Sequence, residues 1–473
     1  MAGVSVLKKL LSVSTLVVCI TGVGMVARFW KMEFVPFQND ADELAFVYAG
    51  QSMLEQGIPI SWSSFSYDEK YHYSYETTGD KSYNTEGEIT FIKPWFDHPY
   101  LLSLLQGLWT EAWGYRFPSA PPSLLVRVPM LALALATLVL FWKIVRQLFS
   151  EQAAVFAYAL FALSPAFIIG QRMVVGENVI VPFLLASIYI MISKSKQWYA
   201  LLPVLAAGAL LTKMTGVIVL LVIGLWFVLQ KNWKSACVYT GLGAGLFLLL
   251  YLPFVYSLGW QEFIEITSKQ SFRLLGWVNP AFIMSQPGFH HYIFFDLSYY
   301  LILILGFSGV IIGKQSLKTR FMQFSTLGAL LLLWITSAEQ DALGWYKLPL
   351  FTLLTVSTGY MFEVIKPSIV AIVGLIMVTN NQGLVRFVEH PLPTTERLRL
   401  TVTSLIGVPF ILDAFTNKKI QQKAITFGLV VVLFLAMAQA LYVADSFYDA
   451  QCQHKHCPIP LVTTTQLLKG FYE

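Results

Sequence analysis

The chain has 473 residues, of which 56% are hydrophobic and only 12% are charged, and its formal net charge is +5. Because a soluble domain typically carries about 25% charged residues, this composition indicates an integral membrane protein with little room for a soluble module. The basic residues stand in small groups beside apolar runs, which argues against a nucleic-acid-binding surface.

Apolar runs recur along the chain, and those of roughly 17–25 residues are long enough to cross a bilayer as helices, whereas several others are short for a full crossing. We therefore expect an all-α polytopic membrane protein with about thirteen transmembrane helices. The expected spans are residues 8–30, 123–145, 152–170, 178–193, 198–212, 214–230, 235–257, 296–313, 321–337, 347–364, 367–380, 400–415 and 424–444.

If these spans alternate in direction, most basic clusters fall on one side, which the positive-inside rule identifies as cytoplasmic. These clusters are Lys8/Lys9, Lys143/Arg146, Lys194/Lys196, Lys231/Lys234, Lys314/Lys318/Arg320, Lys366 and Lys418/Lys419/Lys423. We expect a cytoplasmic N-terminus, an outer C-terminus and a first span retained as an anchor, because Val23–Arg28 is a poor signal-peptide cleavage site.

A long outer loop follows the first span and carries 13 acidic and 5 basic residues between positions 31 and 122. A loop of this length is expected to fold. We predict two interfacial helices, from Ala41 to Glu55 and from Pro99 to Trp113, with short strands or an irregular lid between them. The expected organisation is a first anchor (1–30), this outer loop (31–122), a multi-span domain (123–444) and a short outer tail (445–473).

The first predicted helix begins with an acidic cluster that contains Asp40, Asp42 and Glu43. Neighbouring carboxylates repel each other, and they are tolerated where a helix N-terminus, a metal ion or a substrate takes up the charge. Asp40 can simply cap the helix, whereas Asp42 and Glu43 are candidate catalytic residues. Asp40 and Asp42 also form a D-x-D pattern that can hold a divalent ion.

Several other polar residues on the outer side are candidate substrate ligands. Asp97 and His98 open the second predicted helix, where the acid can act as an N-cap or the pair can contact a phosphate or metal. The remaining candidates are Arg172, Glu177, Lys213, Tyr346 and Lys347. Charged residues at span ends can be ordinary interfacial anchors, but cations on the outer side also suit an anionic ligand.

The outer tail carries Cys452 and Cys457 around a pair of histidines, which predicts a disulfide or, alternatively, a zinc site. Cys19 and Cys237 lie in spans and are expected to be plain packing residues.

Together these motifs resemble the GT-C glycosyltransferases that use lipid-linked phosphosugars, such as the protein O-mannosyltransferases and the aminoarabinose transferases of lipid A. The segment Asp42–Ala49 is similar to the D-E signature in their first outer loop, and Asp97–Tyr100 is similar to the acid-His-Pro version of their second motif. Further similarities lie at Leu125–Pro129, at Ser164-Pro165 with Arg172 and Glu177, at Leu211–Lys213 and at Trp345–Pro349. The resemblance covers most of residues 1–365, and beyond 365 only the hydropathy matches.

The resemblance implies an enzyme that moves a sugar from a polyprenyl-phosphate donor to a hydroxyl of a protein, lipid or glycan at the extracytoplasmic face, with inversion. Asp42 would be the general base, and Glu43 and Glu177 would orient the acceptor or hold a divalent ion. The cations that would neutralise the leaving phosphate are His98, Arg172, Lys213 and Lys347.

A divalent metal ion is the one cofactor considered, and no organic cofactor is expected. The alternative function is a transporter or flippase of lipid-linked intermediates, which the lack of an internal repeat disfavours. The chain contains no Asn-x-Ser/Thr site, which favours a prokaryotic cell membrane over an endoplasmic reticulum.

Overall fold

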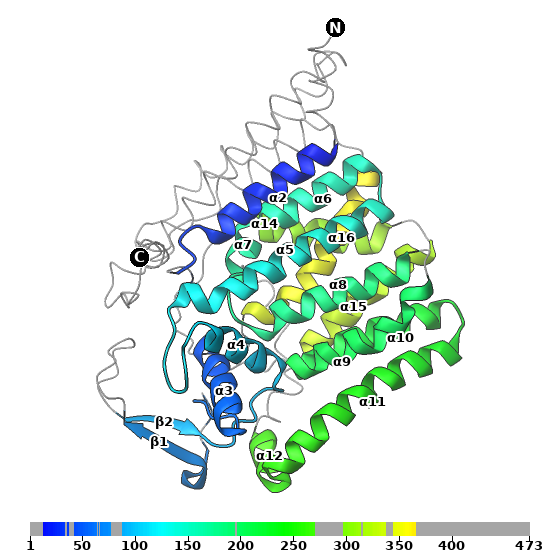
Figure 1. The fold of residues 1–473 in the computed structure, drawn as a ribbon. Coiled ribbons are helices and arrows are strands. Elements are labelled where there is room, and N and C mark those ends of the chain that lie inside the picture. Colours follow the sequence, from blue (N-terminus) through cyan, green and yellow to red (C-terminus); the bar gives the residue numbers. More distant parts are fainter. Residues whose placement is uncertain are drawn as a thin grey trace.

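The computed structural model describes residues 13–33, 36, 42–63, 65, 67–76, 88–193, 196–269, 297–313, 316–336 and 344–365. These residues form a helical bundle with a smaller group of elements gathered at one end of it (Figure 1). The bundle helices are α2 (Val13–Phe29), α5 (Ser123–Leu148), α6 (Glu151–Leu163), α7 (Pro165–Gly170), α8 (Gly176–Ile192), α9 (Leu202–Thr212), α10 (Val217–Leu229), α11 (Trp233–Leu258), α14 (Leu297–Ile312), α15 (Leu317–Thr336) and α16 (Leu348–Ile365).

Each expected span between residues 8 and 364 has a described helix at nearly the same position. The expected span 152–170 is interrupted, because Ser164 adopts an extended conformation (φ −62°, ψ 126°) and Pro165 starts the short helix α7. A proline disfavours helical geometry in the residue before it and is well suited to the first helical turn, which explains the break.

Two helices, Ser123–Leu148 and Trp233–Leu258, are by themselves long and apolar enough to cross a membrane. Shorter apolar helices accompany them, including Val13–Phe29 and Gly176–Ile192. The last three expected spans, 367–380, 400–415 and 424–444, lie outside the described residues, so the count of thirteen stays a prediction.

Helix α6 is enclosed by its neighbours in the bundle. All of its residues from Ala153 to Leu163 are buried, and it packs against α2, α5 and α16. Its aromatic side chains stack closely with those of neighbouring helices, as between Phe161 and Phe141, whose ring centroids are 4.2 Å apart. This close packing makes the bundle rigid, and the candidate site lies at one end of it.

The predicted first outer loop contains helices α3 (Asp42–Gln56) and α4 (Leu101–Ala112), close to the predicted bounds. The two helices cross at Gly50 and Gly107, where a Cβ on Gly50 would lie 1.9 Å from the Ser103 carbonyl oxygen. The exposed Leu105 and Leu108 of α4 suit a membrane surface. Helix α3 differs from the prediction, because residues 43–52 are all buried and so it is enclosed rather than lying along an interface.

Two short antiparallel strands, β1 (His72–Glu76) and β2 (Glu88–Ile92), lie beside these helices, and His72 pairs with Ile92. Ser61 pairs with the other edge of β2 through Ile92. A 3-10 turn, η1 (Glu69–Tyr71), leads into β1, and the short helix α12 (Trp260–Lys269) lies at the same end of the molecule (Figure 1). Other 3-10 turns are η3 (Lys196–Leu201), η4 (Met214–Gly216) and η7 (Gly344–Lys347).

Candidate active site

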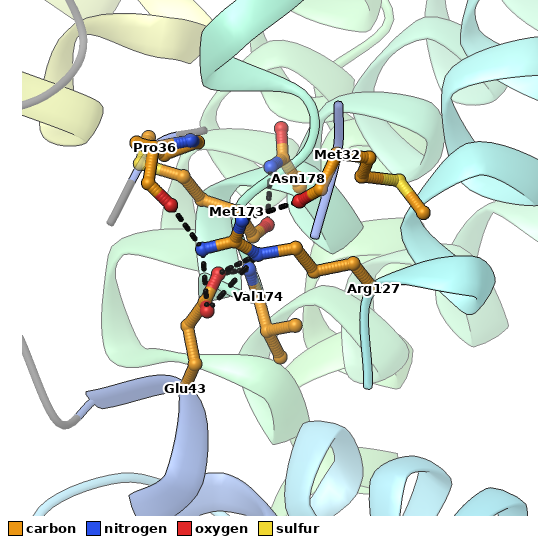
Figure 2. A network of polar contacts seen from close by, with 7 residues as sticks. All are labelled: Met32, Pro36, Glu43, Arg127, Met173, Val174 and Asn178. Atoms are coloured by element: carbon orange, nitrogen blue, oxygen red, sulfur yellow. Dashed lines mark hydrogen bonds and ion pairs between the residues drawn. The ribbon is translucent and has the colours of Figure 1, made fainter. Parts of the chain in front are cut away.

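A buried ion pair joins the first outer loop to the bundle. Glu43 is the second residue of α3, and Arg127 lies in the second turn of α5. The Nη2 atom of Arg127 lies 2.9 Å from Oε2 of Glu43, and its Nε donates to both carboxylate oxygens at 3.1 Å. The backbone N–H of Val174, between α7 and α8, donates to Oε1 of Glu43 at 3.0 Å (Figure 2).

The other donors of Arg127 are also used within the protein. Nη1 donates to the carbonyl oxygen of Met32 and Nη2 to that of Pro36, both at 2.6 Å (Figure 2). A buried ion pair is tolerated when its geometry is good and its remaining donors are satisfied. The Glu43–Arg127 pair therefore works as a joint that holds α3, α5, the α7–α8 turn and the segment after α2 together.

Two more arginines are buried beside this joint. Arg28 donates to the carbonyl oxygens of Gly24 and Ala162 at 2.9 and 2.7 Å, and so contacts the C-terminal end of α6. Arg172 is fully buried and donates to the Ala27 carbonyl oxygen. Burial, followed by the positive charges of Arg127 and Arg28, lowers the pKa of Arg172 to about 9. Arg172 thus remains charged at neutral pH and sits inside the protein.

A second buried ion pair lies at the first turn of α8. Nζ of Lys213, the residue after α9, lies 2.6 Å from Oε1 of Glu177. The same Nζ stands 4.0 Å from the centroid of the Tyr346 ring, a cation–π contact. Oε2 of Glu177 is buried without a hydrogen-bond partner among the residues that the structure describes. Gly176 makes room for this arrangement, since a Cβ there would lie 3.2 Å from Cβ and Cδ of Lys213.

Lys347 follows Tyr346 at the end of η7 and is fully buried. Its Nζ stands 5.2 Å from the centre of the Tyr299 ring. Consecutive residues of one short turn thus reach separate aromatic–cation contacts, Tyr346 with Lys213 and Lys347 with Tyr299.

Asp97 and His98 are partly exposed, and different kinds of contact hold their side chains. The carboxylate of Asp97 accepts hydrogen bonds from the hydroxyl groups of Ser63 and Tyr67. The His98 ring stacks on Phe46 of α3, with centroids 5.2 Å apart and planes at 20°. Phe46 lies one helical turn after Glu43, so the second predicted motif rests directly on the helix of the first.

The structure therefore brings most of the predicted site residues to one end of the bundle. The turn at 174–177 links the two ion pairs, because Val174 contacts Glu43 while Glu177 contacts Lys213. The structure gives the Glu43 carboxylate and Arg172 partners within the protein, and their roles toward substrate stay predictions.

Some predicted site residues fall outside the description. Asp40 and the side chain of Asp42 lie outside the described residues, although Asp42 is the first residue of α3. The cysteines of the tail, Cys452 and Cys457, also lie outside them. Within the described ranges, no group of three His, Cys, Asp or Glu side chains could hold a metal ion. The metal-ion prediction for Asp40 and Asp42 thus stays a prediction.

Sequence reasoning did not select Arg127, Ser63 or Tyr67 as site residues. Arg127 had a usable signal, because an arginine five residues into an apolar span requires an acidic partner. Ser63 and Tyr67 lie in a Ser- and Tyr-rich stretch in which no residue stands out, so only folding of the loop reveals their contact with Asp97.

Residues 97–257 match the family described as dolichyl-phosphate-mannose-protein mannosyltransferase. The fold is similar to the crystal structure of ArnT from Cupriavidus metallidurans bound to undecaprenyl phosphate, with a TM-score of 0.54 and 14% identity over 93% of this chain and 79% of that chain. The family match covers residues 97–257 of the 473-residue chain, and the likeness to ArnT is one of fold; both agree with the resemblance to the GT-C glycosyltransferases that the motifs carry.

A second solved structure with a similar fold is the apo oligosaccharyltransferase of Archaeoglobus fulgidus, with a TM-score of 0.50 and 12% identity over 93% of this chain and 56% of that chain. This chain thus spans just over half the length of the archaeal enzyme. No curated protein sequence matches the chain. The family match from 97 to 257 includes Asp97, Arg127, Glu177 and Lys213, whereas Glu43 lies before it.

Proposed function

We propose that this GT-C enzyme transfers a sugar from a polyprenyl-phosphate-linked donor to a hydroxyl group of its acceptor at the extracytoplasmic face of the membrane. The proposal is supported by the similar fold of an ArnT that binds undecaprenyl phosphate. A lipid-linked donor also suits a helical bundle in which the buried pairs Glu43–Arg127 and Glu177–Lys213 are linked through the α7–α8 turn.

The observation that carries the proposal is the meeting of distant polar segments at the α7–α8 turn. The start of α3, which begins at Asp42, contacts the α7–α8 turn through Glu43, and this turn leads directly to the Glu177–Lys213 pair. The helix that carries the acid Asp42 thus contacts the turn that leads to the cation Lys213. The acid can accept a proton, and the cation can bind a phosphate.

In the proposed reaction, Asp42 is the general base. It removes the proton from the acceptor hydroxyl while the hydroxyl oxygen bonds to the anomeric carbon of the donor sugar. The bond between that carbon and the phosphate oxygen breaks at the same time, and the polyprenyl phosphate leaves with the bonding electrons. A single displacement of this kind inverts the anomeric configuration.

Glu177 and Lys213 have complementary roles in this proposal. The buried Oε2 of Glu177 has no protein partner within the described part of the chain, so it can accept a hydrogen bond from the acceptor hydroxyl. Lys213, held between Glu177 and the Tyr346 ring, neutralises the leaving phosphate. His98 and Lys347 add positive charge. We assign a different role to the buried Arg172, whose positive charge acts on the phosphate from a distance and not through contact.

The proposal is tested by an Asp42→Asn variant, assayed for transfer from a polyprenyl-phosphate sugar in bilayers. We expect a loss of at least 100-fold in the transfer rate, which is typical for removal of a general base. The matched control is Asp68→Asn in the same loop, where the exposed acid pairs with Lys269 at 3.0 Å and is outside the site. Near-normal transfer by Asp42→Asn at unchanged expression would remove Asp42 from this role.

A divalent ion between Asp40 and Asp42 is the metal that this proposal includes. Its test is transfer after treatment with a chelator, followed by addition of Mg²⁺ or Mn²⁺. Loss of transfer that the added ion restores would support the site, and transfer at the full rate in chelator would reject it.

The sugar and the acceptor are identified by mass spectrometry of surface glycans and glycolipids from cells with and without the protein. We expect a prokaryotic cell membrane with a cytoplasmic N-terminus, so the missing sugar should be found on outward-facing molecules. Loss of a modification from cytoplasmic molecules alone would contradict the proposed orientation.

A further inference from the structure

The segment that precedes η1 holds Asp97 in a fixed orientation. Ser63 donates its hydroxyl hydrogen bond to Oδ2 of Asp97, and Tyr67 donates to Oδ1. Each carboxylate oxygen therefore has its own donor, and the plane of the carboxylate is set by two side chains that are 34 and 30 residues away in sequence.

The two donors are themselves held in place. Tyr67 is 5% exposed, and the Nζ of Lys269 in α12 stands 5.6 Å from the centre of its ring. The carbonyl oxygen of Tyr67 is in hydrogen-bond contact with Nε2 of His72 at 3.2 Å, and the Ser63 hydroxyl oxygen accepts from the N–H of Phe65 at 3.1 Å. These contacts fix both hydroxyl groups before any substrate arrives.

The neighbour of Asp97 is fixed as well, but by packing. His98 stacks on Phe46 and meets Trp95 edge-on, with ring centroids 5.8 Å apart. The dipeptide thus has one side chain fixed by aromatic contacts and the other by hydrogen bonds. Such double support is typical of groups that must present a defined geometry to a ligand.

We propose that Ser63 and Tyr67 are positioning residues that orient Asp97 to accept a hydrogen bond from a hydroxyl group of the donor sugar. The inference rests on the proposed function, in which His98, the next residue, contributes positive charge toward the donor phosphate. A sugar joined to that phosphate places its hydroxyl donors within reach of the adjacent carboxylate, which in its ionised form has hydrogen-bond acceptors and no donor.

The test compares the kinetics of Tyr67→Phe and Ser63→Ala, which each remove one hydroxyl group and leave the rest of the side chain in place. We expect each change to raise the KM for the lipid-linked donor roughly tenfold, because one hydrogen bond to a charged group no longer orients Asp97. The KM for the acceptor should stay the same.

The matched control is Tyr71→Phe. Tyr71 is also buried and lies four residues after Tyr67, at the end of η1, but its hydroxyl group donates to Glu265 of α12 at 2.5 Å and does not contact Asp97. We expect an unchanged donor KM for this variant. A rise equal to that of Tyr67→Phe would show that any loss of a buried hydroxyl in the segment has the same effect, and would overturn the proposal.

A positioning role also predicts dependence on Asp97 itself. In an Asp97→Asn background, Tyr67→Phe should change the donor KM by less than twofold, since the oriented carboxylate is already lost. A full tenfold effect in that background would assign Tyr67 a structural role. Melting temperatures of all variants separate folding defects from kinetic ones, and Ser63→Ala provides a second, smaller change if Tyr67→Phe folds poorly.

The outcome also distinguishes this inference from the proposed function. If the unmodified protein does not transfer sugar from a polyprenyl-phosphate donor, the proposed function fails. If it does transfer, and Asp42→Asn abolishes transfer while Tyr67→Phe and Ser63→Ala leave the donor KM unchanged, only the positioning role is wrong.

Discussion

Replacing the carboxylate by an amide is predicted to have different effects at the adjacent acids Asp42 and Glu43. Replacing Glu43 by Gln removes the charge that faces Arg127 and leaves a buried guanidinium without an ionic partner. Replacing Asp42 by Asn at the start of α3 removes the proposed base and leaves this joint intact. We expect Glu43→Gln to lower stability and Asp42→Asn to abolish transfer without lowering stability.

The size of the stability loss follows from burial of the pair. The side chains of Arg127 and Glu43 are only 1% and 6% exposed, so water does not screen their interaction. Breaking a buried pair by removing one partner costs about 3–5 kcal/mol. We expect about 3 kcal/mol for Glu43→Gln, the lower end, because the amide oxygen can still accept from Arg127 and from the N–H of Val174.

The assay is the thermal unfolding of purified protein in detergent, read beside the transfer rate. For a chain of 473 residues the entropy of unfolding is about 1 kcal/mol/K, so 3 kcal/mol corresponds to a fall of about 3 °C in the melting temperature. Because a buried pair replaced as a unit by apolar groups is often neutral, Glu43→Gln combined with Arg127→Met should recover part of this loss.

The reasoning is refuted if Glu43→Gln melts at the same temperature as the unmodified protein and loses transfer. That result would assign Glu43 a catalytic role in place of a structural one. An equal fall in melting temperature for Asp42→Asn would also contradict the division of roles between these neighbours.

Three further predictions concern close packing and the second ion pair. Gly50→Ala should place a Cβ 1.9 Å from a backbone oxygen of α4 and destabilise the protein by about 1–3 kcal/mol, whereas Gly241→Ala, with nothing within 4 Å, should leave the melting temperature unchanged or higher. Lys213→Met should destabilise by about 3–5 kcal/mol because it strands the Glu177 carboxylate, and the double change with Glu177→Gln should restore the melting temperature but not the transfer rate. Gly176→Ala should displace Lys213 by a few tenths of an ångström and raise the donor KM while changing the melting temperature little; equal KM values would contradict the phosphate role.

The sequence was sufficient to predict the helices because long apolar runs and basic clusters constrain a membrane chain strongly. It also predicted α3 and α4 within about two residues, from caps and periodicity. The enclosure of α3 could not be predicted in this way, because it depends on α4 crossing at Gly50 and Gly107. Hydrophobic periodicity describes one helix at a time and contains no information about which partner covers its polar side.

The candidate site was predictable where a charged residue interrupts an apolar run, as at Glu177 and Lys213. Their pairing was not predictable, because 36 residues separate them and both appeared as independent substrate ligands. Glu43 is the clearest difference. Its place in a D-E motif predicted catalysis, while the fold directs its carboxylate to Arg127 in another helix.

The central claim is that the polar end of the bundle binds the phosphate of an isoprenoid lipid beside an acid that activates the acceptor. An experimental structure of the protein with polyprenyl phosphate tests this claim most directly. The account predicts that the phosphate lies within hydrogen-bond distance of Lys213 and next to the start of α3. A phosphate bound at the opposite end of the bundle, away from Glu177 and Lys213, would contradict it.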